Sequence, residues 1–319
     1  MASTTTAPPL LTPAGPFSLA ASARFLEGFA PAAHPGGQDD DERPTLRLAF
    51  PLDGTGELVG AAVTQEDDGR VSVGTDARDP EAVAAQVRRV LSLDVDGEGF
   101  AGVGEADPVV GRLQRAYPGL RPVCFASPYE AACWGVIGQR VRMTQAAATK
   151  ERIAREHGGV LDVAGVPLPV FPGPRALHDV AGTLPLPAAK RERLAALAAA
   201  ALDGVLDADR LRSTAADDAL ADLQRLPGIG PFSAELVLVR GAGAPDVFPR
   251  SEGRLHDSMR QLWDAPDADV PRLARVAARW SPYRSWVALL VRAHREATTG
   301  EIASGRRVRG AAHLPKGLS

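Results

Sequence analysis

The feature that most constrains this chain is a tight turn between two helical patterns, within residues 223–240. An amphipathic pattern ends at Leu226, Pro-Gly-Ile-Gly follows, and a second helical pattern starts at once. Gly228 and Gly230 let the backbone turn sharply around Ile229 and approach a facing surface closely. The N–H groups that open the second helix suit an anion such as phosphate. Gly-Ile-Gly alone would favour an ordinary helix–helix turn, whereas the full motif favours a hairpin that grips phosphate.

Composition is that of a soluble globular protein with a sizeable core. The 319 residues are 45 % hydrophobic and 24 % charged, and this length suggests about two domains. No apolar run approaches the roughly 18 residues that a membrane span needs. Cys124 and Cys133 are too few for a disulfide framework, an iron–sulfur cluster or a Cys-rich zinc site. We therefore expect a reduced, cytoplasmic protein without a membrane segment, associated with the nucleoid in a bacterium.

The net charge of –3 hides an asymmetry along the chain. Residues 1–120 carry 9 basic and 18 acidic side chains, and residues 121–319 carry 27 and 21. A basic C-terminal portion is typical of a protein that binds a polyanion through that part of the chain. Two domains with different surfaces would give the same asymmetry.

Hydrophobic patterning predicts four parts. Residues 1–15 read as a disordered tail, and residues 16–120 as a small α+β domain with an acidic loop at 34–44. Alternating side chains predict strands at 45–50 and 70–73, and turn residues at 53–54 and 67–69 favour a further strand at 57–63 between them. An Asp-Pro start predicts a helix at 80–93 after Asp79. Residues 121–301 read as a succession of helices almost without strand pattern, and residues 302–319 as a basic tail.

Further motifs in the helical part share a single resemblance. The 223–240 segment resembles the helix-hairpin-helix of the HhH-GPD DNA glycosylases, and other landmarks follow in the same order. They resemble those of the inducible 3-methyladenine DNA glycosylases: Ser127-Pro-Tyr-Glu130 with Ile137-Gly-Gln-Arg-Val141, Phe171-Pro-Gly-Pro174, Leu186-Pro187 with Lys190-Arg191, and Trp280-Ser-Pro-Tyr-Arg-Ser-Trp286. The resemblance implies a TATA-binding-protein-like α+β domain followed by an all-α glycosylase domain.

The same resemblance implies a reaction, the hydrolysis of the N-glycosidic bond of a damaged base in DNA. The base must first leave the stack, and positive charge then develops on the deoxyribose. A fixed carboxylate beside the sugar stabilises that charge. Aligning Asp246-Val-Phe248 with the family's "DVF" places Glu252 where the family has Asp. Capping of the following helix by Glu252 is the competing interpretation. Phe232 stands where bifunctional members carry a nucleophilic Lys, so a monofunctional enzyme without lyase activity is expected.

The resemblance also marks residues that would bind the base and the DNA. The expected base pocket comprises Phe232, Trp134, Trp286, Leu236 and Arg292, although a buried Trp at helical spacing is more often a core residue than a pocket residue. Gln139 and Arg140 occupy the region that wedges into the emptied stack, where Arg140 would otherwise be ordinary solvated surface. The expected contacts to the DNA backbone are Gly228, Ile229, Gly230, Ser233, Arg250 and Arg254. An Arg in the pocket would oppose a cationic base.

The resemblance implies no organic cofactor. It implies one ion, a Na⁺ or K⁺ at the hairpin held by the backbone carbonyls of Gln224, Leu226 and Ile229. The six histidines show no metal-ligand spacing.

Two rival interpretations remain besides a monomeric enzyme that acts on damaged DNA. A damaged-DNA-binding protein with weakened or lost catalysis would keep the hairpin and the basic helical part. A helical protein–protein module would show no affinity for DNA and no salt dependence.

Overall fold

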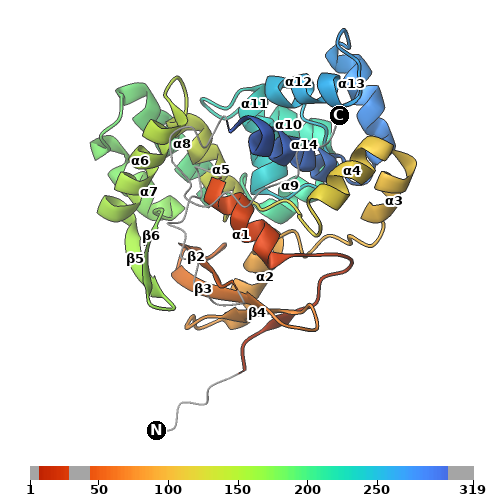
Figure 1. Cartoon of the computed structure of the whole chain (residues 1–319). Coiled ribbons are helices and arrows are strands. Elements are labelled where there is room, and N and C mark those ends of the chain that lie inside the picture. Colours follow the sequence, from red (N-terminus) through yellow and green to blue (C-terminus); the bar gives the residue numbers. More distant parts are fainter. Residues whose placement is uncertain (1–6, 29–43, 301–319) are drawn as a thin grey trace.

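The computed structural model describes residues 7–28 and 44–300, which form a small sheet beneath a larger body of helices (Figure 1). The sheet is antiparallel with the order β1-β4-β3-β2. The bounds of its strands are β1 Leu10–Leu11, β2 Leu46–Pro51, β3 Leu58–Gln65 and β4 Val71–Gly74. Buried and half-buried residues alternate along β2, β3 and β4, and the three predicted strands are confirmed.

Two helices lie against this sheet, α1 at Leu19–Gly28 and α2 at Pro80–Val90. Asp79 caps α2 by accepting the Ala82 N–H at 3.0 Å, as expected from the sequence. The apolar faces of α1, α2 and the sheet form one hydrophobic cluster. Its buried residues run along the sequence from Leu11 to Val123.

The prediction of a disordered tail at residues 1–15 is wrong for residues 7–15. Leu10 and Leu11 pair with β4 as β1, and Leu11 is 1 % exposed. The segment that follows is held by Arg121, whose side chain is buried and donates to the carbonyls of Ala14 and Pro16. A long-range partner, which local polarity does not reveal, therefore orders this segment. Residues 1–6, most of the acidic loop 34–44 and the basic tail 302–319 lie outside the described residues.

Helices dominate the rest of the described chain. Their bounds are α3 Phe100–Ala106, α4 Pro108–Ala116, α5 Pro128–Ile137, α6 Met143–Ile153, α7 Pro174–Val180, α8 Ala188–Leu202, α9 Ala208–Ser213, α10 Ala216–Gln224, α11 Pro231–Leu236, α12 Gly253–Leu262, α13 Val270–Ala277 and α14 Arg284–Thr299. Short turns of 3₁₀-helix or π-helix are η2 Ala154–Gly158, η3 Ala181–Thr183, η4 Val237–Gly241 and η5 Ala278–Trp280. None of the described helices is long and apolar enough to cross a membrane.

The expectation of an all-helical part beyond residue 121 is wrong at one place. β5, Gly159–Val163, and β6, Val166–Val170, form an antiparallel hairpin. The hairpin packs against β2 and β3, and a Cβ on Gly60 would lie 2.7 Å from Val163. The two strands are short, exposed along β5 and rich in Pro and Gly, so their alternation is weak in the sequence.

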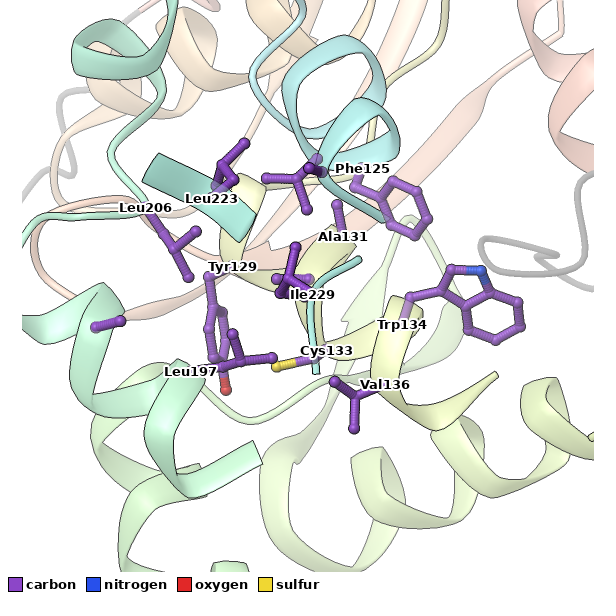
Figure 2. Packing of buried hydrophobic residues seen from close by; sticks show 14 of the residues in the cluster. Phe125, Tyr129, Ala131, Cys133, Trp134, Val136, Leu197, Leu206, Leu223 and Ile229 are labelled. Atoms are coloured by element: carbon purple, nitrogen blue, oxygen red, sulfur yellow. The ribbon is translucent and has the colours of Figure 1, made fainter. Parts of the chain in front are cut away.

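The core consists of three hydrophobic clusters. The largest is built from residues 125–247 and includes Phe125, Tyr129 and Ile229 (Figure 2). The second belongs to the sheet. The third joins residues 95–120 to residues 248–291, so it spans the domain boundary expected at residue 120. The domain limits themselves stay a prediction.

Candidate active site

The predicted hairpin is present between α10 and α11. Gly228 has φ +87°, a conformation that favours glycine, and a Cβ there would lie 2.6 Å from the Arg193 side chain. Ile229 is buried among the first cluster's side chains (Figure 2) and fixes the turn. A Cβ on Gly230 would meet open space. A side chain at position 228 would therefore strain the backbone and clash with Arg193. Gly230, in contrast, borders open space at the start of α11.

Gln139 ties the predicted wedge region to this hairpin. Its Nε2 donates to the Gly228 carbonyl at 2.6 Å, and its Oε1 accepts from Arg193 at 2.8 Å. Lys190, on the same helix as Arg193, donates to the carbonyls of Ile137 and Gln139 at 2.8 and 2.9 Å. Burial, with the nearby Arg193 charge, lowers the pKa of Lys190. Gln139 thus holds the hairpin in place rather than presenting its amide to solvent.

The residues after Gln139 are exposed. Arg140 has φ +58°, unusual for a residue with a side chain, and Val141 and Met143 are 36 % and 41 % exposed. Arg140 therefore stands in solvent, as either of its two interpretations requires. The sequence did not predict that the apolar Val141 and Met143 beside it are exposed, because residue type alone does not determine exposure.

Glu252 stands at the N-cap position of α12, and its side chain makes no capping hydrogen bond. Its Oε1 instead lies 2.5 Å from Nε of Arg292 on α14. The structure thus brings together the expected catalytic carboxylate and one expected pocket residue, 40 positions apart. Arg250 and Arg254, which flank Glu252 and are expected to contact the DNA backbone, are exposed. Arg292 makes the ion pair with Glu252.

Glu235 on α11 holds the backbone that leads to Glu252. It is 7 % exposed, and its carboxylate accepts from the N–H groups of Arg250 and Ser251 at 2.8 and 2.9 Å and from the Ser251 hydroxyl at 3.3 Å. Burial raises the pKa of Glu235, and the hydrogen bonds from residues 250 and 251 counter part of that rise. Sequence reasoning missed this residue, whose only signal is an acidic side chain on the inward face of the helix.

A second anchor holds the same segment at its beginning. Asp246 forms a bidentate ion pair with Arg284 at the start of α14, at 2.7 and 3.0 Å, and accepts from the Ser281 hydroxyl. The Ser285 hydroxyl donates to the Val247 carbonyl and accepts the Val247 N–H, both at 3.0 Å. The "DVF" and Trp-Ser-Pro-Tyr-Arg-Ser-Trp motifs are therefore in direct contact, which sequence order alone does not show.

The expected pocket residues are not gathered at one surface. Trp286 is 2 % exposed and packs against Phe100 and Tyr283, so it belongs to the core. Trp134 is 6 % exposed in the first cluster. Leu236 packs partly buried against the same cluster. Phe232 is 53 % exposed in the first turn of α11, which leaves it as the aromatic face open to a base.

The expected phosphate contacts differ in their exposure. Ser233 is buried, and its Oγ would lie 3.3 Å from a Cβ on Gly135, so its hydroxyl faces α5 and not the DNA side expected. Arg250 and Arg254 are exposed on either side of Glu252. For the expected cation, the Leu226 carbonyl already accepts the Ile229 N–H at 3.0 Å and retains a second lone pair. Among the described residues, His, Cys, Asp and Glu form no group of three suited to a metal.

The chain is similar to several curated DNA-repair proteins, although no protein-family model matches it. It is 32 % identical over 253 residues to the probable bifunctional transcriptional activator/DNA repair enzyme AlkA of Mycobacterium tuberculosis, over 78 % of this chain and 49 % of that relative. This chain thus spans about half the length of that relative. DNA-3-methyladenine glycosylase 2 of Escherichia coli is 32 % identical over 184 residues, 56 % of this chain and 62 % of the relative.

Solved structures share the fold. A 3-methyladenine DNA glycosylase from Archaeoglobus fulgidus superposes with a TM-score of 0.73 at 19 % identity, covering 91 % of this chain and 99 % of the other. An 8-oxoguanine glycosylase/lyase from Clostridium acetobutylicum, bound to double-stranded DNA, gives a TM-score of 0.57 at 16 % identity, covering 77 % and 84 %. The fold and the hairpin are those of the helix-hairpin-helix DNA glycosylases. In sequence the chain is similar to the 3-methyladenine DNA glycosylase branch of that superfamily.

Proposed function

We propose that this protein is a monofunctional DNA glycosylase, which hydrolyses the N-glycosidic bond of a damaged base in base excision repair. The observation that carries the proposal is the position of Glu252. Its carboxylate follows the hairpin, sits at a helix start, and extends from a backbone held by Glu235 and Asp246. A carboxylate fixed in advance stabilises an oxocarbenium-like sugar without further reorganisation.

The DNA would lie against the hairpin and the exposed Arg140. The open surface at Gly230 and the N–H groups at the start of α11 suit a phosphate. Because Ser233 is buried, these N–H groups would bind the phosphate instead of its hydroxyl. A Na⁺ or K⁺ on the carbonyls of Gln224, Leu226 and Ile229 would bridge the hairpin to that phosphate. The damaged base would stack on Phe232, which is exposed beside the hairpin.

Phe232 also supports hydrolysis without a lyase step. A Schiff base with the sugar requires an amine at the site, and this side chain offers none where the bifunctional relatives carry Lys. Two of the curated relatives are named for 3-methyladenine, so alkylated purines are the first class of substrate to test. We further propose that the protein acts as a monomer on nucleoid DNA.

The deciding experiment measures base release from methylated DNA by the wild type and by Glu252→Gln. We expect the substitution to slow release at least about a hundredfold, because a neutral amide cannot balance the charge on the sugar. Binding to a duplex with an abasic-site analogue should persist in both proteins. Equal release by both proteins would contradict the role of Glu252.

One observation favours a second candidate, a damaged-DNA-binding protein without catalysis. The Arg292 ion pair partly neutralises Glu252. Binding by the wild type without release of any base, across methylated, deaminated, oxidised and bulky-alkyl substrates, would establish this alternative.

A further inference from the structure

Arg292 is the one charged residue among the expected pocket residues, and the others are apolar or aromatic. It lies on α14, its Nε is 2.5 Å from Oε1 of Glu252, and the two side chains are 20 % and 24 % exposed. The described residues offer no further hydrogen-bond partner to its two Nη groups. A guanidinium presents five donors in a rigid fork. The pairing with Glu252 through Nε therefore leaves the Nη donors of Arg292 available to a further acceptor.

The charged surroundings of Glu252 are balanced rather than acidic. Arg240 on η4 is half-buried. Desolvation is the largest influence on its pKa and lowers it, while the Glu252 charge raises it and the Arg292 charge lowers it further. Glu235 is the second carboxylate in the neighbourhood, and its pKa is raised in part by Glu252. The exposed Arg250 and Arg254 flank the site along the chain. A positively charged base entering here would meet no excess of negative charge.

Bond cleavage distinguishes two kinds of base. The C1′–N bond breaks with its electron pair left on the base nitrogen, water oxygen bonds to C1′, and the water proton passes to solvent. A base that is cationic before cleavage then leaves as a neutral molecule. A base that is neutral before cleavage leaves as an anion, which takes up one proton from solvent. The anion needs a donor or a positive charge nearby as it forms.

We infer that Arg292 selects damaged bases that are neutral before cleavage, by donating its Nη hydrogens to the leaving base while its Nε holds Glu252. This inference rests on the proposed glycosylase function and names the substrate class of the same site. Glu252 would stabilise the positive sugar and Arg292 the negative leaving group. Cationic alkylpurines, which gain nothing from Arg292, would be the poorer substrates.

The test compares two purine lesions in otherwise identical duplexes, hypoxanthine as the neutral base and 7-methylguanine as the cationic base. Single-turnover release is measured with the wild type, Arg292→Met, Arg292→Lys and the exposed control Arg279→Met. We expect the wild type to release hypoxanthine faster. Arg292→Met should lose about 10- to 100-fold on hypoxanthine, the range of one charge-assisted hydrogen bond, and should match or exceed the wild type on 7-methylguanine. Arg292→Lys should recover part of the hypoxanthine rate.

Three outcomes would overturn the inference. Equal losses on both lesions would mean that Arg292 only positions Glu252, and no loss would mean that it plays no part. A wild type that prefers 7-methylguanine would contradict the selection directly. Thermal melting and binding of the abasic-analogue duplex show whether each variant is folded. If the folded wild type releases no base of any class, the proposed function fails first and this inference fails with it.

Discussion

Residues 245–252 and residues 139–143 both follow a helix and both belong to the proposed site, yet they are held very differently. The first segment is bonded at both ends, through Asp246 to Arg284 and through Glu235 to the backbone before Glu252. The second is bonded through Gln139 alone among its described side chains, and its remaining residues are exposed. A group that stabilises a transition state must be fixed in advance, whereas a group that enters a DNA stack must remain accessible.

Among the substitutions that test how the two segments are held, the largest effect is expected from Glu235→Gln, which loosens the first segment. Glu235→Gln places an NH₂ donor against backbone N–H donors, so residues 250–252 should shift and base release should slow about 10- to 100-fold. The free energy of unfolding should fall by about 1–3 kcal/mol. Single-turnover base release and chemical denaturation measure the two effects, with the exposed Glu57→Gln as control.

If Glu235 only positions the backbone before Glu252, Glu235→Gln should slow base release without weakening DNA binding. Binding of the abasic-analogue duplex should stay near that of the wild type, because the hairpin is unchanged. If release by the folded Glu235→Gln equals that of the wild type, the segment does not need this anchor and the contrast with residues 139–143 loses its functional meaning.

A smaller effect is expected at the other anchor, Asp246. Burial raises the pKa of this carboxyl, but hydrogen bonds from Arg284 and Ser281 outweigh it, so the pKa lies below the ordinary 3.8. The ionised form is thus favoured by folding, and its contribution is full above pH 3.8 and is lost as pH falls through the lower folded pKa. Because both partners are about one-third exposed, Asp246→Asn should cost about 1 kcal/mol at neutral pH.

Thermal melting as a function of pH tests this prediction. The difference between wild type and Asp246→Asn should be constant near neutrality and should shrink below pH 3.8. The exposed Asp267→Asn is the control and should follow the wild type throughout. A difference that persists unchanged in acid would mean that the ion pair with Arg284 does not stabilise the fold.

The smallest effect belongs to the exposed segment. Arg140→Ala and Arg140→Gly should each reduce the slope of log affinity for DNA against log salt concentration by about one, as the loss of one phosphate contact does. Because Arg140 has φ +58°, Gly should raise the stability by up to about 1 kcal/mol relative to Ala. Titrations at several salt concentrations and melting curves measure both quantities. An unchanged slope in both variants would assign Arg140 to ordinary solvated surface.

The sequence by itself determined the elements and the motif that names the superfamily. Strands β2 and β4 follow from alternation, β3 from the turn residues on either side of it, and α2 from the cap at Asp79. The hairpin at Gly228 follows from glycines that permit its backbone conformation. These features are local, because each depends on residues within a few positions of one another.

The tertiary structure alone decided how the site is put together. It paired Glu252 with Arg292, placed Glu235 under the backbone of residues 250–251, and buried Trp286 where a stacking face was expected. It also turned the Ser233 hydroxyl toward α5. Each of these facts depends on which side chain a distant element brings within hydrogen-bonding or packing distance. The spacing of residues along the chain does not determine the distance between side chains of distant elements. The sequence therefore predicted candidate site residues, and the fold decided which side chains they contact.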